Sequence, residues 1–131
     1  MYCHLNKNNI FVNEQFGFKE KLSTEMATFT LFNKVLLSPD KKNFVVGLFC
    51  DLHKAFNCIN HNILLAKMEF NQISGIVNNL MGSYLDNRYQ IISMKDSKFN
   101  KVYSKWEHVT HGVVQGSVLG PLLLLIYIND F

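Results

Sequence analysis

A single aspartate, Asp51, follows the apolar run FVVGLFC at positions 44–50. A carboxylate at the end of a buried hydrophobic segment must be hydrated, hydrogen-bonded or paired with a cation. Mg²⁺ prefers hard oxygen ligands and usually takes one or two carboxylates together with substrate phosphates. Asp51 is therefore a candidate metal ligand. The alternative, which the spacing alone favours, is that Asp51 only caps the turn into LHKAF.

A glycine-rich turn, HGVVQGS at positions 111–117, precedes a final apolar segment. Glycine lets the backbone approach a ligand closely, and the N-terminus of a following helix favours phosphate. The turn matches neither G-x-x-x-x-G-K-[ST] nor G-x-G-x-x-G, the two common nucleotide-binding patterns. An ordinary connecting turn remains the alternative.

The remaining polar residues indicate less about chemistry. The five histidines show no zinc-ligand pattern. Thirteen basic residues against ten acidic ones give a net charge of +3, and lysines spread along the chain could line a phosphate-facing groove or simply form a solvated surface. The three cysteines, which include no C-x-x-C pair, are interpreted as reduced structural thiols of an intracellular protein.

Length and hydropathy limit the class of protein. A chain of 131 residues that is 48% hydrophobic suits one globular domain. The N-terminus lacks the apolar region of a signal peptide. The longest apolar run, residues 122–128, is far shorter than the roughly 20 residues of a membrane helix. We expect an intracellular protein of the nucleus or cytoplasm, with no membrane partner and no small-molecule cofactor.

Hydrophobic periodicity predicts an α+β fold. Ser23 and Thr24 precede a helical pattern that continues to residue 37, and Thr24 is the expected N-cap. Residues 1–18 read as a short helix or loop, and 38–43 as a turn with Pro39. Residues 44–51 predict a strand buried on both faces. Further helices are expected at 61–70, 74–88 and 117–128, and two strands, 89–95 and 101–109, should be joined by the turn 96–100.

Four segments together resemble one known family. They are NEQFGFKEKLSTEMA at 13–27, VGLFCDLHKAFNCINHNILLAKM at 46–68, GSYLDNRYQ at 82–90 and GVVQGSVLGPLLLLIYINDF at 112–131. In order and spacing they resemble the reverse transcriptase domain of non-LTR, LINE-type or jockey-like, retrotransposons, and the resemblance covers nearly the whole chain. It implies part of a right-hand polymerase, an RNA-directed DNA polymerase, with about 1–43 as a fingers part and 44–131 as a palm part carrying a fingers-like hairpin.

The resemblance also implies roles for individual residues. In this family two palm aspartates hold two Mg²⁺ ions, and Asp51 matches the first of them. The backbone at Leu52 would approach the metal and the triphosphate. Phe56 matches the aromatic residue that packs against the sugar and excludes a 2′-hydroxyl. Gln115 and Gly116 match the pair that lines the incoming-nucleotide and template side.

Partners follow from the same resemblance, namely an RNA template, a DNA primer and a dNTP. Lys19 lies where the family usually has an arginine that binds the triphosphate; lysine keeps the charge but loses the bidentate geometry of the guanidinium.

The sequence also departs from the family pattern. Val114 replaces the usual proline before Gln115, and Asn57 and Asn60 lie where aspartate is common. The F/Y-A-D-D hairpin with the second catalytic aspartates, which follows the YIND segment in the family, is not present, and Asp130 is not its equivalent. We therefore expect this chain alone to be inactive, with the helix at 117–128 incompletely covered. The alternative is a non-catalytic retrotransposon remnant that at most binds nucleic acid; a small interaction protein with coincidental similarity is a third, remote reading.

Overall fold

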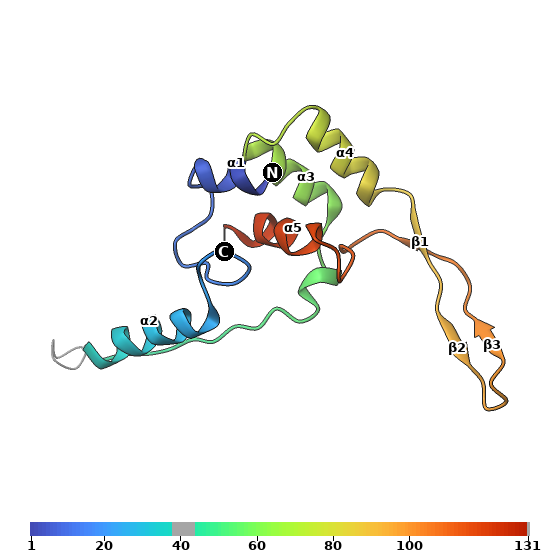
Figure 1. The fold of residues 1–131 in the computed structure, drawn as a ribbon, viewed down its shortest axis with the longest axis horizontal. Coiled ribbons are helices and arrows are strands. Elements are labelled where there is room, and N and C mark those ends of the chain that lie inside the picture. The colour runs from blue at the N-terminus through green and yellow to red at the C-terminus, as the bar shows by residue number, and fades with distance from the viewer. Residues whose placement is uncertain (38–43, 131) are drawn as a thin grey trace.

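The computed structural model of the protein describes residues 1–37 and 44–130 (Figure 1). Helices and short antiparallel ladders make up the regular structure, which confirms the α+β class. In chain order the elements are α1 (Tyr2–Lys7), α2 (Thr24–Leu37), the 3₁₀ helix η2 (Ala55–Asn57), α3 (His61–Phe70), α4 (Ile76–Leu85), β1 (Arg88–Gln90), β2 (Ser93–Lys95), β3 (Lys101–Tyr103), β4 (Glu107–Val109) and α5 (Leu119–Ile128).

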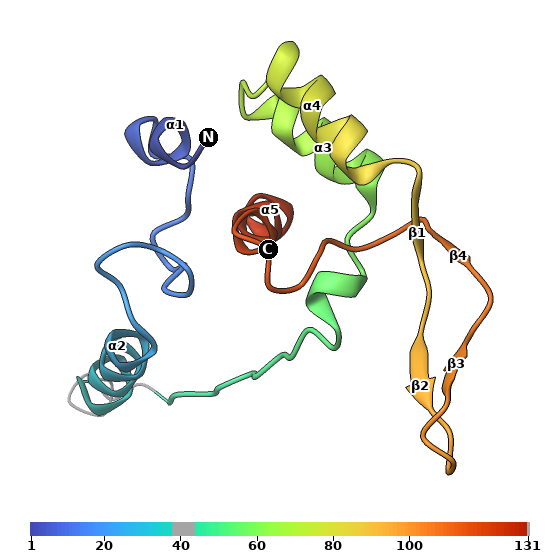
Figure 2. The ribbon, with the colours of Figure 1, turned by 45° about the vertical axis from the view of Figure 1, so that its right-hand side comes forward.

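Helix α5 lies at the centre of the hydrophobic core. Four successive residues, 123–126, are buried; since successive helical residues point about 100° apart, the helix must be covered on most sides. Figure 2 shows α5 nearly end-on between the N-terminal segment and the α3–α4 pair. The expectation that this helix would be incompletely covered is therefore wrong for residues 123–126, whereas Val118, near the expected start of the helix, is 94% exposed. Burial of each large apolar side chain stabilises the fold by about 1.5–3 kcal/mol.

Helix α3 packs against one side of α5, and α4 packs against α3. Asn60 caps α3 by accepting a hydrogen bond from the Ile63 amide at 3.2 Å through its side-chain oxygen. Leu64 and Met68, one turn apart, are buried in the core together with Met81 and Leu85 of α4. The predicted helices are confirmed, and α4 is shorter at both ends than the sequence pattern suggested.

The predicted strand at 44–51 is wrong. In the described chain these residues form no ladder and are exposed, with Phe44 at 101% and Phe49 at 83% of their full accessibility. A strand buried on both faces needs partner strands and apolar cover, and among residues 1–37 and 44–130 nothing supplies either. The predicted turn at 38–43 lies outside the described residues.

Helix α2 forms as predicted but buries no residue of its own. Its N-terminal cap is Ser23 rather than Thr24, because the Ser23 hydroxyl accepts from the Met26 amide at 3.2 Å. In Figure 1 the helix projects away from the core helices. Its apolar side chains are exposed: Met26, Phe29, Leu31, Phe32, Val35, Leu36 and Leu37.

The predicted hairpin is confirmed as an interrupted ribbon, defined here as residues 88–111. β1 pairs with β4 and β2 pairs with β3, both antiparallel. Between the ladders, residues 91–92 face residues 104–106, so one strand carries an extra residue as in a β-bulge. The Ser104 hydroxyl accepts from the Ile92 amide at 3.0 Å and takes the place of a ladder carbonyl. At the tip, Asp96 accepts from the amides of Lys98 and Asn100.

Two further expectations concern cysteines and membranes. Cys3, Cys50 and Cys58 carry free thiols, but all three are exposed, so none is a packed structural residue of the core. Within the described ranges, no helix combines the length and the apolar character that crossing a bilayer requires.

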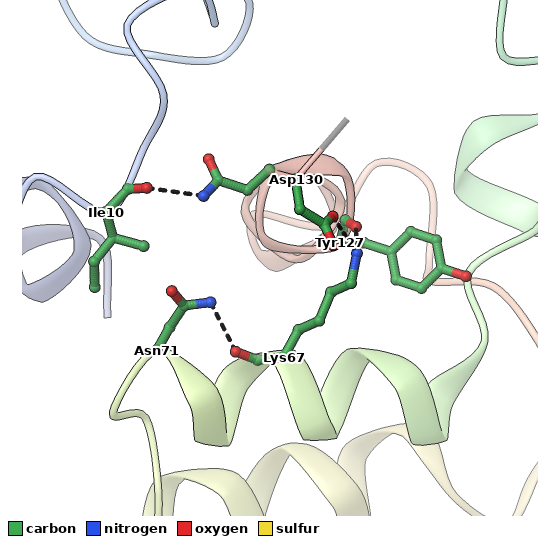
Figure 3. Close-up of polar contacts among 6 residues, drawn as sticks. Ile10, Lys67, Asn71, Tyr127 and Asp130 are labelled. Atoms are coloured by element: carbon green, nitrogen blue, oxygen red, sulfur yellow. Dashed lines mark hydrogen bonds and ion pairs between the residues drawn. The ribbon is translucent and has the colours of Figure 1, made fainter.

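A polar network ties the end of α5 to α3 and to the N-terminal segment (Figure 3). The Lys67 ammonium pairs with the Asp130 carboxylate and donates to the Tyr127 carbonyl. The Asn129 amide donates to the Ile10 carbonyl at 2.8 Å, and its oxygen accepts from the Val12 amide at 3.2 Å. Segments at least 60 positions apart in sequence are thereby joined at one end of the core.

Replacing Asp130 with asparagine should make the fold less sensitive to acid. The hydrogen bond from Lys67 holds the pKa of Asp130 below its ordinary value of 3.8. A carboxyl group whose pKa is lowered by folding stabilises the protein above its unfolded pKa, and this contribution disappears as the pH falls through the folded value. Urea midpoints at about pH 6 and about pH 2.5 should therefore differ less in Asp130→Asn than in the wild type.

The effect should be small, because the Asp130 side chain is 68% exposed and its charge is screened by solvent. Asp86→Asn, which removes an exposed carboxylate outside the network, is the matched control and should keep the wild-type acid sensitivity. Equal acid sensitivity in Asp130→Asn and the wild type would contradict a stabilising contribution from the Lys67–Asp130 pair.

Candidate functional site

Gly112 brings the glycine turn into direct contact with η2. Its φ of +86° is in the left-handed region, and a Cβ at this position would lie 2.9 Å from both the Asn57 Cα and the Phe56 carbonyl oxygen. The Gly112 amide donates to the Ile59 carbonyl at 2.7 Å, and the Val113 amide donates to the Phe56 carbonyl at 2.8 Å. Only glycine fits both the conformation and the space.

His61 holds the same turn from the other side. Its Nε2 lies 2.8 Å from the Gly112 carbonyl oxygen, and since a carbonyl only accepts, the imidazole donates this bond. The neighbouring residue Asn60 forms an isolated antiparallel bridge with His111. The first turn of α3 thus fixes the position at which the glycine turn begins.

Gln115 and Gly116 follow on the exposed side of the turn. The Gln115 side-chain amide donates to the Asn57 side-chain oxygen at 3.4 Å. Gly116 has a φ of +78° and open space where a Cβ would lie. The Ser117 hydroxyl then accepts from the Gly120 amide at 2.9 Å, the bond that an N-cap side chain makes at the start of a helix.

Phe56 lies between the turn and the N-terminal segment. Its ring contacts that of Phe18 edge-on, with centroids 6.3 Å apart, and its edge is 3.8 Å from the position of a Cβ on Gly120. The ring therefore lies against two other parts of the chain, Phe18 and the start of α5. Because Lys19 follows Phe18, this contact also brings the backbone that carries Lys19 close to Phe56.

The Lys19 ammonium is positioned by the polar network at the end of α5. It donates to the Val12 carbonyl at 3.2 Å and lies 5.8 Å from the centre of the Phe11 ring. Val12 is in turn held through its amide by Asn129. Asn129 therefore fixes the segment against which Lys19 rests.

Asp51 and Leu52 lie at a different opening from Gln115. They line a cavity of about 170 Å³ with residues of η2 and the second half of α5, among them Ala55, Leu124 and Tyr127. Both residues are exposed. Over the described positions, no three His, Cys, Asp or Glu side chains gather closely enough to hold a metal ion. Asp51 is thus a single accessible carboxylate at the edge of a small, mostly apolar cavity.

A larger cavity of about 520 Å³ opens beside Gln115, between the glycine turn and the base of the ribbon. Polar side chains from both elements line it, chiefly Asn57, Arg88, Tyr89, His108 and Gln115. The rings of Tyr89 and His108, neighbours across the β1–β4 ladder, are 5.0 Å apart.

The structure therefore brings some of the sequence-predicted residues together and leaves others apart. Phe56 joins the turn that carries Gln115 and Gly116, and the Phe18–Phe56 contact brings Lys19 into their neighbourhood. Asp51 and Leu52 line a separate cavity. Sequence reasoning did not single out the positioning residues His61 and Asn129, whose only signal was their place inside the quoted motifs.

Comparison with known proteins assigns the chain to a family. The model of the family described as reverse transcriptase (RNA-dependent DNA polymerase) matches residues 1–131, the whole chain. The chain belongs to the reverse transcriptase family.

Relatives of this reverse transcriptase chain come from mobile elements. It is 29% identical to the probable RNA-directed DNA polymerase from transposon BS of Drosophila melanogaster, over 96% of this chain and 13% of the relative. It is 32% identical to the corresponding proteins of the X-element and of jockey from the same organism, each over 88% of this chain and 12% of the relative. These relatives confirm the resemblance to jockey-like elements, and the chain spans about one eighth of their length. No solved structure matches.

Replacing Gly112 with alanine should destabilise this reverse transcriptase chain much more than replacing Gly75. Both glycines have positive φ, +86° and +63°, but only at Gly112 would a Cβ meet backbone atoms at 2.9 Å, whereas Gly75 has open space. A positive φ alone costs a residue with a side chain about 1–3 kcal/mol. We expect Gly75→Ala to lose about that amount and Gly112→Ala at least about 2 kcal/mol more, as measured by urea unfolding. Equal losses would show that the contact with η2 is not close.

Proposed function

We propose that this chain supplies one carboxylate and the nucleotide-facing side of an RNA-directed DNA polymerase site that works within a longer polypeptide. The observation that carries the proposal is the Gly112–η2 contact. It holds Phe56 and Gln115, which are far apart in sequence, on one rigid unit. A polymerase needs such rigidity, because positioning of the nucleotide supplies much of the rate enhancement in phosphoryl transfer.

Phe56 is the proposed sugar-facing residue. Its ring is clamped by Phe18 and by the start of α5, so it has little freedom to move away from an additional oxygen. A flat ring below C2′ leaves no room for a 2′-hydroxyl, which favours a dNTP over a ribonucleotide. Gln115 and Gly116 would border the incoming nucleotide and the template, with the exposed amide of Gln115 supported by Asn57.

Asp51 is the proposed metal ligand. A carboxylate fits the oxygen preference of Mg²⁺, and Asp51 is accessible at the edge of its cavity. When bound, Mg²⁺ would supply charge stabilisation for the transferring phosphoryl group. Since one carboxylate does not hold two metal ions, the other ligands would come from the remainder of the longer polypeptide. The backbone at Leu52 would lie beside the same opening.

Lys19 would neutralise the triphosphate after leaving the Val12 carbonyl. Its ammonium makes one neutral hydrogen bond and a weak ring contact in this structure, and both are easily exchanged for phosphate oxygens. The proposed partners are an RNA template, a DNA primer and a dNTP, inside the cell in the nucleus or cytoplasm. Residues 1–43 would belong to the fingers and 44–131 to the palm, with the ribbon as a fingers-like insertion.

A second candidate function is nucleic-acid binding without catalysis by this chain alone. It is favoured by the single exposed carboxylate at the proposed metal position and by the lack of a metal-ligand cluster in the described part of the chain.

A chimera tests the polymerase proposal. This chain would replace the matching segment of the jockey RNA-directed DNA polymerase of Drosophila melanogaster, to which it is 32% identical over 118 residues. The chimera should extend a DNA primer on an RNA template with Mg²⁺ and dNTPs. Asp51→Asn should lower the rate by about a thousandfold or more, because the lost metal contact is worth several kcal/mol.

Two controls accompany the chimera. Asp86→Asn removes another exposed aspartate and should change the rate less than about threefold. The isolated 131-residue chain should show no extension above background, since one carboxylate does not complete the metal centre. A chimera that extends equally well with Asp51→Asn would reject the role of Asp51, and extension by the isolated chain would reject the need for a longer polypeptide.

A further inference from the structure

The ribbon carries the whole net charge of the protein. Residues 88–111 contain five basic and two acidic residues, so the rest of the chain, with eight of each, is neutral. Four of the basic residues are exposed lysines, and no ion pair among the described residues involves them. They are Lys95, Lys98, Lys101 and Lys105. A concentration of unpaired cations on one projecting element attracts a polyanion.

Exposed aromatic side chains are interleaved with these lysines. Phe99, Trp106, Tyr89 and Tyr103 are all more than half exposed. In a short ribbon that rests on the core only at its base, these rings gain nothing from burial within the fold. Basic side chains alternating with aromatic faces are the composition of surfaces that bind single strands, where phosphates meet the cations and bases stack on the rings.

The base of the ribbon adds a cavity to this surface. The cavity of about 520 Å³ beside Gln115 is lined by Tyr89, His108 and Arg88, and its volume is within the roughly 300–1,000 Å³ of known ligand sites. Arg88 brings a positive charge to this cavity, and its guanidinium lies 5.6 Å from the centre of the Tyr84 ring. Polar groups on the opposite wall, from Asn57 and Gln115, suit the hydrogen-bonding edge of a base.

We propose that the ribbon is a binding arm for single-stranded nucleic acid, and that one unpaired base stacks on Tyr89 in the cavity beside Gln115. The proposal rests on the proposed function only in that the cavity borders Gln115. A single strand fits better than a duplex, because the faces of duplex bases are already stacked. The polar lining also fits a base better than the acyl chain of a lipid.

Tyr89 and Tyr103 provide a matched pair of variants. They lie on the same ribbon and are exposed to the same extent, 58% and 57%, but only Tyr89 lines the cavity. Fluorescence anisotropy of the 131-residue chain with a labelled 15-nucleotide oligo(U) measures the effect. Tyr89→Ala should raise Kd about 5- to 150-fold, the range found for losing one base–aromatic stack. Tyr103→Ala, which removes a ring of the same surface outside the cavity, should raise it less than Tyr89→Ala does. Tyr89→Phe, which keeps the ring, should bind nearly as the wild type does.

The salt dependence of binding tests the charge of the arm. Lys98→Gln combined with Lys101→Gln should reduce the slope of log Kd against log salt concentration by about 1.4, since each phosphate contact on a single strand contributes about 0.7. Lys7→Gln combined with Lys21→Gln removes the same charge from exposed positions outside the ribbon and should leave the slope unchanged.

Several results would contradict the proposal that the ribbon is a binding arm. They are equal effects of Tyr89→Ala and Tyr103→Ala, equal slopes in the two lysine pairs, or tighter binding to a duplex or to phosphatidylserine vesicles than to oligo(U). The binding assay uses neither Mg²⁺ nor dNTP. Its result therefore does not depend on whether the proposed polymerase function is correct. If the chimera is active but Tyr89→Ala weakens binding no more than Tyr103→Ala, only the binding-arm proposal is rejected. If the chimera is inactive but Tyr89→Ala weakens binding selectively, only the polymerase proposal is rejected.

Discussion

Burial of α5 is the constraint on which the rest of the structure depends. A helix with the sequence LGPLLLLIYI has no polar face to turn toward water, so its free energy is lowest when other segments surround it. The N-terminal segment, α3 and the glycine turn provide that cover. Polar contacts of Lys67, Asn129 and Asp130 then fix how α3 and the N-terminal segment are positioned along α5, because apolar burial is not directional.

The contact between Gly112 and η2 follows from this packing and determines the geometry of the candidate site. Once α5 is enclosed, the turn before it must pass close to the backbone of residues 56 and 57. The short distance excludes a side chain at position 112 and orients the segment that carries Gln115. One steric requirement in the core thus positions a polar side chain at the edge of a cavity.

Several segments that do not pack against α5 are exposed to solvent. Helix α2 and residues 44–52 present many apolar side chains to solvent, a large exposed area for a protein of this size. The relatives are about eight times longer than this chain, which is consistent with cover from a longer polypeptide. The ribbon is exposed for a different reason, since its lysines and aromatic rings suit a charged partner rather than a hydrophobic core.

The sequence by itself determined the local elements and the family. Periodicity predicted α2, α3, α4 and α5, alternation predicted the ribbon, and motif order indicated a reverse transcriptase, because these features depend only on neighbouring residues and their spacing. Only the tertiary structure decided whether an apolar segment is buried. Residues 44–51 and 122–128 are similarly apolar, yet the first is exposed and the second central, since burial depends on which partners lie nearby in space. The same holds for the site: the Phe56 and Gln115 segments meet through a glycine contact across the fold, while Asp51 borders another cavity, and no local pattern encodes that separation.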